Sequence, residues 1–292
     1  SADDGATWSL IGDNEINDGI YAWNPETFTL MGRIRLIDAA ANPSDPNAVA
    51  DVSDDVFTVG AAGNVYYIND ASVAGTEFGI TNPGNNANSG TTLADPMASL
   101  NALLNVYDLN PGDKVYVDSG VYDLPTNIRI LAQDSGVEII GPSSLGHSAT
   151  FNRGNVNEGQ FGIELRSAKN VTLRNVRVTG AQSGVVAYDA DGLKVYNSLF
   201  FNNAVYGLYV ETDTINVVIS GNTAYGTTGN GAIDQENGFY LRGDRMTVSN
   251  NISYKVGNQL GTGIWIDSAD ELTVFGNLAY NNNNGYTITT SQ

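Results

Sequence analysis

The chain has 292 residues, which is enough for one large domain or two smaller ones with a buried core. Acidic residues outnumber basic ones by 32 to 13 and the formal net charge is −19, so we expect neither nucleic acid nor an anionic membrane as a partner. The absence of cysteine and the single histidine, His147, exclude disulfides, thiolate metal sites and multi-histidine zinc sites. No apolar run is long enough for membrane insertion, and the opening "SADDGATWSL" reads as a mature segment or a piece of a longer protein.

Residues 1–59 contain short apolar segments separated by turn-forming residues, which predicts a β-rich unit of about four strands. The segments are "TWSLIG", "GIYAWNP", "GRIRLIDA" and "DVFTVG". The stretches "GIYAWNP", "RIRLIDA" and "SDDVFTVG" resemble the later half of an Ig-like domain of the Ser-Thr-rich, KNH-like type, found beside repeats in surface proteins. An Ig-like sandwich needs roughly seven strands, so the resemblance implies a partial Ig-like domain. A small β-rich spacer is the alternative, and the strand count favours it.

The rest of the chain, residues 60–292, opens with a strand, a loop rich in Gly and Asn, and a short helix near 95–108. Asp95 suits the N-cap position, and a proline suits the first position of a helix. The apolar residues that follow have the spacing of one helix face: Leu100, Leu103, Leu104 and Tyr107. The next segment, "KVYVDSGVYDL", alternates as a strand, so we expect a cap region over 60–112 and repeating coils over 113–292.

The repeating coils are marked by glycines that each precede an alternating segment, at a spacing typical of solenoids: Gly136, Gly162, Gly184, Gly207, Gly238, Gly263 and Gly285. A second strand follows each first one, and alternation points side chains such as Ile163, Leu165, Leu272 and Val274 inward. The turn after the second strand begins with Asn or Gly, the residues that tolerate positive φ. The next position holds an asparagine in three coils, and we expect these amides to stack as a ladder at one corner: Asn222, Asn251 and Asn277.

These features together resemble the right-handed parallel β-helix repeat family, the pectate-lyase-like superfamily. The resemblance rests on "SGT…DP…L…PGDKVYVDSGVY", the Gly-led strands and the asparagine corner. It implies an all-β fold, a right-handed parallel β-helix whose first coil is covered by a short amphipathic helix and which is preceded by a small β-sandwich-like segment. In lyases and epimerases of this family, the outward face of the Gly-led strands commonly carries the polysaccharide groove.

The outward positions of the Gly-led strands form two neighbouring columns that mix aromatic and charged residues. Aromatic rings stack on sugar rings, and arginine and carboxylate groups bond to hydroxyl or acidic groups. We therefore predict a ligand-binding face made of Tyr188, Tyr209, Glu211, Tyr240, Arg242, Trp265 and Asp267. The alternative, which is somewhat favoured, is that these side chains only stabilise the sheet through cross-strand pairs. A second outward series, Tyr225, Tyr254 and Tyr280, is interpreted as sheet stabilisation.

Carboxylates gather just after the Gly-led strands, where stacked coils would bring like charges together. Calcium would bridge such groups through oxygen ligands, and the candidate ligands are Asp189, Asp191, Asp213 and Asp244. The sequence has no EF-hand loop and no calcium-binding nonapeptide repeat, so a solvated acidic edge is the favoured alternative.

The motifs of the family's enzymes are missing from the chain. The only histidine lies in "LGHSAT" rather than in the "GHG" segment of polygalacturonases, and the "DPHE" segment of alginate epimerases does not occur. No catalytic residue is assigned, and enzymatic activity is left open, with a polysaccharide lyase or epimerase as the form it would take.

Two functions remain. The favoured one is a structural or adhesive module at the cell surface or outside the cell. Such a module would form part of a longer protein or a filament, with head-to-tail self-association or neighbouring domains as partners. The alternative is a domain that binds or modifies an extracellular polysaccharide containing uronic acids.

Overall fold

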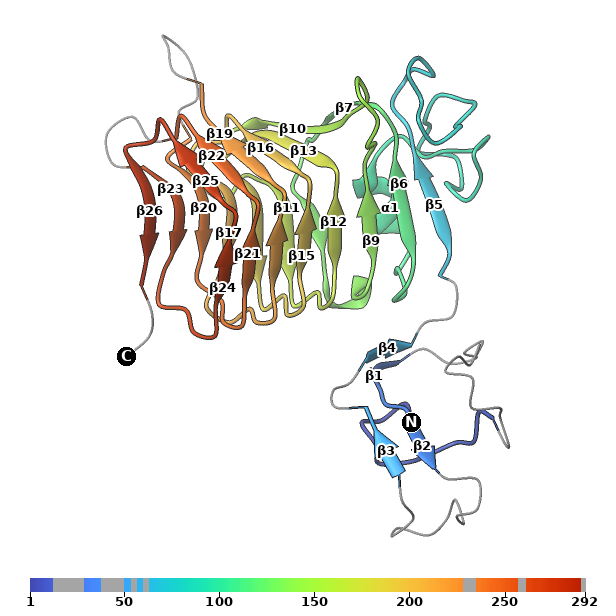
Figure 1. Ribbon diagram of the computed structural model, residues 1–292. Helices are drawn as coiled ribbons and strands as arrows, with labels where there is room; N and C mark the ends of the chain where they lie inside the picture. Colours follow the sequence, from blue (N-terminus) through green and yellow to red (C-terminus); the bar gives the residue numbers. More distant parts are fainter. Residues whose placement is uncertain are drawn as a thin grey trace. The chain divides into compact units, whose positions relative to one another are not determined.

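The computed structural model describes residues 1–12, 29–37, 50–53, 57–59, 63–227, 235–256 and 261–289. The chain divides into two compact units, Ser1–Gly63 and Asn64–Gln292 (Figure 1). Within the part described, no helix is long and apolar enough to cross a membrane.

The first unit contains two small antiparallel sheets. One pairs β1 (Thr29–Gly32) with β4 (Phe57–Val59), and the other pairs β2 (Arg35–Ile37) with β3 (Ala50–Val52). A strand was predicted in "TWSLIG", but the structure has none at residues 7–12. The segment "GIYAWNP" lies outside the described residues. These two sheets do not show an Ig-like sandwich, so the Ig-like assignment stays a prediction.

The second unit is a right-handed parallel β-helix in which three sheets run along the solenoid axis (Figure 1). Along each sheet, hydrogen-bonded neighbours are one coil apart in the chain and all are parallel. The eight-stranded sheet consists of β5 (Val65–Ile68), β6 (Lys114–Val117), β9 (Glu138–Ile140), β12 (Thr172–Arg174), β15 (Lys194–Tyr196), β18 (Val218–Ser220), β21 (Thr247–Ser249) and β24 (Thr273–Phe275).

The other two sheets have seven strands each. The sheet that follows the asparagine turn contains β7 (Gly120–Asp123), β10 (Ala149–Asn155), β13 (Val176–Ala181), β16 (Leu199–Phe201), β19 (Thr223–Tyr225), β22 (Ile252–Tyr254) and β25 (Leu278–Tyr280). The third sheet, here called the β8–β26 sheet, contains β8 (Ile128–Ile130) and six Gly-led strands: β11 (Phe161–Arg166), β14 (Ser183–Tyr188), β17 (Tyr206–Val210), β20 (Asn237–Leu241), β23 (Thr262–Ile266) and β26 (Asn284–Ile288). The prediction was wrong for Gly136, which precedes β9 in the eight-stranded sheet.

The core is made of the inward residues that period-two alternation predicts. One fully buried column runs through five paired strands of the β8–β26 sheet: Ile163, Val185, Leu208, Phe239 and Ile264. The last coil departs from the prediction, since Val274 is 36% exposed and Leu272 is only partly buried. These side chains have a neighbouring coil on one side only, so the inward orientation alone does not bury them.

The glycines at the start of β11, β14, β17, β20 and β23 are required by close packing between coils. A Cβ atom on Gly184 would lie 2.6 Å from the carbonyl oxygen of Gly207, and one on Gly207 would lie 2.5 Å from that of Gly238. Any larger residue would therefore push two coils apart, which explains why the repeat keeps glycine here.

The predicted asparagine ladder is confirmed. Asn222 and Asn251 are fully buried, and the Oδ1 atom of Asn251 accepts from the backbone N–H of Asn222 at 2.9 Å. In the same way Asn277 Oδ1 accepts from the Asn251 N–H at 2.9 Å, and Asn251 Nδ2 donates to the Ile219 carbonyl at 2.8 Å. Each amide thus satisfies backbone groups of the preceding coil, and amide-to-amide bonds such as Asn251 Nδ2 to Asn277 Oδ1 at 3.0 Å link it to the following one.

A second polar ladder occupies the corner before the β8–β26 sheet and was not predicted. Asn203 Oδ1 accepts from the Ala181 N–H at 3.1 Å, and Gln235 Oε1 accepts from the Asn203 N–H at 3.4 Å. Two coils later, Asn282 Oδ1 accepts from the Val256 N–H at 3.1 Å. Asn282 belongs to a run of four asparagines at residues 281–284, and this run is therefore part of a structural corner.

Helix α1 (Leu100–Val106) begins later than predicted, with Ser99 rather than Asp95 as its N-cap. The Ser99 Oγ atom accepts from the Ala102 N–H at 3.2 Å. The Met97 N–H donates to the Tyr67 carbonyl at 3.0 Å, and this pairing keeps the chain extended where the helix was expected to start. Leu100 and Leu103 are buried against the first coil, so α1 covers it as expected.

Candidate ligand-binding face

Three consecutive coils bring aromatic rings into register on the outer face of the β8–β26 sheet. Tyr209 pairs with Tyr240, and Tyr240 pairs with Trp265. Their ring centroids are 5.5 Å and 4.5 Å apart, and Tyr206 lies 5.2 Å from Tyr209. The predicted cluster therefore exists, but the rings lean on one another, so a ligand would meet mainly their edges and polar tips.

Charged groups lie beside the rings in the second predicted column. The Arg242 guanidinium is 3.0 Å from Glu211 Oε1 and 3.5 Å from Asp267 Oδ2. The Tyr209 hydroxyl donates to Glu211, and the Tyr240 hydroxyl donates to Asp267 Oδ2 at 3.0 Å. Five of the seven predicted ligand residues therefore form one network of hydrogen bonds and ion pairs, and Trp265 joins it through ring contact with Tyr240.

This network fixes the protonation states of its members. Burial opposes ionisation of Glu211 and Asp267, but hydrogen bonds from Tyr209 and Thr289 respectively outweigh it and lower the pKa of each carboxyl. Burial, followed by the hydrogen bond to Asp267, raises the pKa of Tyr240 to about 12. Near neutral pH the carboxylates are ionised and the phenol keeps its proton, so the network suits the binding of polar groups better than proton abstraction.

The outward column that carries the rings of Tyr209, Tyr240 and Trp265 becomes buried toward α1. Glu164 is 2% exposed and Val186 is 1% exposed. The Glu164 carboxylate accepts from Asn127 Nδ2 at 3.0 Å, from Arg129 Nε at 3.1 Å and from Arg166 Nε at 2.5 Å. Burial raises the pKa of Glu164, but these hydrogen bonds and charges prevail and leave it lowered. Glu164 therefore organises the α1 end of the face and is not available to a ligand.

Tyr188 links the two ends of the face. The guanidinium of Arg166 lies 4.6 Å from the centre of the Tyr188 ring, and the Tyr188 and Tyr209 rings meet edge to face at 6.1 Å. All seven predicted ligand residues thus lie on one sheet face, in the register that the repeat predicts.

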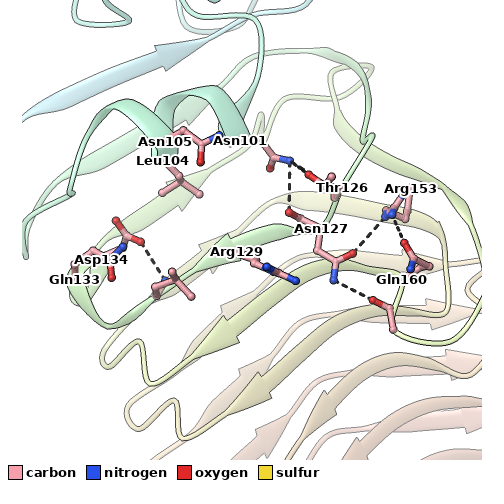
Figure 2. A pocket seen from close by; sticks show the side chains of 12 residues that line it. Asn101, Leu104, Asn105, Thr126, Asn127, Arg129, Gln133, Asp134, Arg153 and Gln160 are labelled. Atoms are coloured by element: carbon pink, nitrogen blue, oxygen red, sulfur yellow. Dashed lines mark hydrogen bonds between the residues drawn. The ribbon is translucent and has the colours of Figure 1, made fainter.

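A pocket with a volume of about 500 Å³ lies where this face meets α1 (Figure 2). Its lining comes from α1, from β8 and the turns on either side of it, and from β10 and the turn that follows: Asn101, Leu104, Asn105, Thr126, Asn127, Arg129, Leu131, Gln133, Asp134, Arg153, Gly159 and Gln160. The lining is mostly polar, and Figure 2 shows amide and guanidinium groups gathered at the end opposite Asp134.

Hydrogen bonds hold the polar end of the pocket in place. Arg153 donates from Nη1 to the Leu124 carbonyl at 3.0 Å, from Nε to Asn127 Oδ1 at 3.4 Å, and from Nη2 to Gln160 Oε1. Asn101 Nδ2 donates to the Thr126 hydroxyl at 3.1 Å. At the other end, the buried Asp134 carboxylate accepts the N–H groups of Leu131 and Leu109.

The sequence analysis missed this pocket. Its residues come from segments outside the regular repeat, so no column pattern marks them. One signal was available, because Ala149, Phe151 and Arg153 alternate along one strand and Arg153 therefore falls at an inward position. An arginine at an inward position of a strand marks a polar interruption of the core.

The four predicted calcium ligands lie at turns of successive coils, where they bond to protein groups. Lys169 Nζ pairs with Asp189 and lies 3.0 Å from Asp191 Oδ2. Asp213 accepts from the Asp189 N–H and Asp244 from the Asp270 N–H, each at 2.8 Å. Among the described residues, no three or more acidic or histidine side chains form a group suited to a metal ion. Calcium at these positions stays a prediction.

The second tyrosine series stacks along β19, β22 and β25, the last three strands of the sheet that follows the asparagine turn. The Tyr225 and Tyr254 rings are 5.0 Å apart at 12°, and those of Tyr254 and Tyr280 are 5.1 Å apart at 9°. Each ring in this stack covers the face of the next ring, which agrees with a role in stabilising the sheet.

Comparison with protein-family models supports the fold. A family model described as a right handed beta helix region matches residues 125–233. The crystal structure of pectate lyase Pel9A shares 16% identity, with 77% of this chain and 68% of that chain covered and a TM-score of 0.39. An alginate lyase from Paenibacillus sp. str. FPU-7 shares 14% identity, with 66% of this chain and 96% of that chain covered and a TM-score of 0.31. No curated protein matches the chain.

Proposed function

We propose that this β-helix binds a polysaccharide along the outer face of the β8–β26 sheet and in the adjoining pocket. The observation that carries the proposal is the polar pocket at the end of a face lined by aromatic and charged side chains. Its volume of about 500 Å³ falls within the range of small-molecule sites, roughly 300–1,000 Å³. Amide, hydroxyl and guanidinium groups together provide the donors and acceptors that sugar hydroxyl groups require.

The solenoid itself favours a polymeric ligand. Equivalent side chains recur at the strand spacing of about 4.8 Å from coil to coil. A chain molecule with repeating hydroxyl groups meets similar partners on each coil, as with Tyr209, Tyr240 and Trp265. Because such polymers occur mostly outside cells, we also propose an extracellular or cell-surface location.

Replacement of Trp265 by alanine tests this function. The ring lies on β23, at the end of the face away from the pocket, and contacts Tyr240 at 4.5 Å. We expect Trp265→Ala to weaken polysaccharide binding at least tenfold on a glycan array and in affinity electrophoresis, since aromatic anchors commonly contribute ~2 kcal/mol or more. Product absorbance measured on the same samples would detect any lyase activity.

Tyr254→Ala is the matched control, because Tyr254 belongs to an aromatic stack on a different sheet. It should leave binding unchanged. If no polysaccharide binds the wild-type chain, or if both variants lose binding in proportion to a fall in melting temperature, the proposal is wrong.

A structural or adhesive surface module is the second candidate, and the exposed end of the solenoid favours it. Apolar side chains of the last coil are open to solvent, among them Phe275 at 54%, Leu278 at 51% and Ile288 at 48%. A neighbouring copy that stacks on this coil would bury them and extend the rod.

A further inference from the structure

Arg153 is a buried cation in the wall of the pocket. It follows Ala149 and Phe151 at the inward positions of β10, and it is 8% exposed. Burial of an unpaired charge costs several kcal/mol, so a position of this kind needs a reason. Figure 2 shows the guanidinium at the polar end of the pocket, beside Asn127 and Gln160.

The partners of Arg153 are all neutral. Its three hydrogen bonds go to the Leu124 carbonyl and to the side-chain oxygens of Asn127 and Gln160. A guanidinium has five N–H donors, so two remain. Within the part of the chain that the structure describes, Arg153 pairs with no carboxylate, whereas Arg129 and Arg166 both pair with Glu164.

The other charges of the pocket leave the charge of Arg153 uncompensated. Arg129 pairs with Glu164, a carboxylate that it shares with Arg166, and Asp134 lies at the opposite end, where its carboxylate accepts from backbone N–H groups. The polar end of this pocket is thus locally cationic in a protein whose net charge is −19. An anion bound there would gain charge-assisted hydrogen bonds from the two remaining donors.

The pocket also holds a buried acceptor that lacks a donor. Asn101 Oδ1 has no hydrogen-bond partner among the described residues, although its Nδ2 atom donates to Thr126. A ligand hydroxyl would satisfy this oxygen. The lining therefore matches a ligand that carries both an anionic group and hydroxyl groups.

We propose that this pocket is an anion-binding site in which Arg153 holds a carboxylate or sulfate group of a polyhydroxylated ligand. This deepens the proposed polysaccharide function and rests on it for the identity of the ligand as a sugar. Gln160 and Asn127 orient the guanidinium, and Asn101 accepts from a hydroxyl group of the same sugar unit.

Titration of the wild-type chain with glucuronate, glucose 6-sulfate and glucose tests the site, with the Arg153 side-chain N–H signals followed by NMR. A charge-assisted hydrogen bond predicts that one or both anions bind roughly ten- to a hundredfold more tightly than glucose. The two anions distinguish a carboxylate from a sulfate ligand. Equal affinity for all three sugars would overturn the inference.

Gln160→Glu is the decisive variant, because it places a carboxylate against the Arg153 guanidinium without changing the shape of the side chain. We expect it to lower anion affinity at least tenfold while the melting temperature stays equal or rises. Arg153→Gln should give the same loss of affinity, and Arg177→Gln, an exposed arginine on β13, should give none.

The two proposals fail in different ways. If Gln160→Glu retains full anion affinity, the anion site is wrong, while polysaccharide binding that depends on Trp265 stands. If anions bind through Arg153 but no polysaccharide binds the face, the proposed function is wrong and the anion site stands. If no sugar binds at all, both are overturned.

Discussion

Asn251 joins three consecutive coils through one side chain. Its amide nitrogen donates to the Ile219 carbonyl at 2.8 Å and its amide oxygen accepts from the Asn222 N–H at 2.9 Å, both in a fully buried setting. An unpaired buried backbone group costs about 1–3 kcal/mol, and both partners would be left unpaired together. The free energy that Asn251 contributes is therefore a substantial part of a total stability of about 5–15 kcal/mol.

We predict that Asn251→Leu lowers the free energy of unfolding by about 2–4 kcal/mol in urea denaturation, because leucine keeps the volume but loses both bonds. The neighbouring Asn250 is exposed and has a φ of 55°, so Asn250→Gly should change stability by less than about 0.5 kcal/mol. A leucine variant as stable as the wild-type chain would mean that water or relaxed geometry satisfies these groups.

Strands and turns that recur in every coil could be predicted from the sequence. Features that depend on a tertiary contact made only once in the chain could not. Alternation and glycine spacing identified β11 to β26 of the β8–β26 sheet because the same residues recur in those coils, whereas β8 has no leading glycine and was not identified. The start of α1 was missed because the pairing of Met97 with Tyr67 is a tertiary contact that overrides the capping preference of Asp95. The pocket was missed for the same reason, since its lining residues meet only after α1 and the first coils have packed.

At the level of the sheet, the buried carboxylate of Glu164 on β11 should make stability depend on pH. Hydrogen bonds and charges from Asn127, Arg129 and Arg166 keep its pKa below the ordinary value of 4.5 despite burial. A pKa lowered by folding adds stability above the ordinary value, and that stability is lost as the pH falls through the lower folded value. Acidification below about 4.5 should therefore release this contribution.

Glu164→Gln tests this dependence. Urea denaturation measured at a series of acidic pH values should show a smaller loss of stability for the variant than for the wild-type chain. Glu158→Gln, which changes an exposed side chain in the turn between β10 and β11, should leave the slope as it is. A Glu164→Gln variant with the wild-type slope would assign the acid sensitivity to other carboxylates.

At the scale of the whole molecule, we propose that a second copy of this chain stacks on the coil formed by β24, β25 and β26. Strands β24, β25 and β26 each pair with a neighbour on one side only, and their apolar side chains are exposed. Unpaired parallel strand edges with apolar side chains are a template for another chain. A head-to-tail contact between this coil and a second copy does not close on itself and would therefore produce a filament rather than a dimer.

We accordingly predict that the 292-residue chain shows a concentration-dependent increase in mass by sedimentation velocity, with rods of increasing length by negative-stain microscopy. Leu278→Lys places a charge on the exposed edge strand β25 and should weaken association at least tenfold. Leu145→Lys changes a still more exposed leucine in a turn away from this edge and should have no effect. A chain that stays monomeric at all concentrations would contradict the filament, whereas a discrete dimer would show that two such edges close on each other.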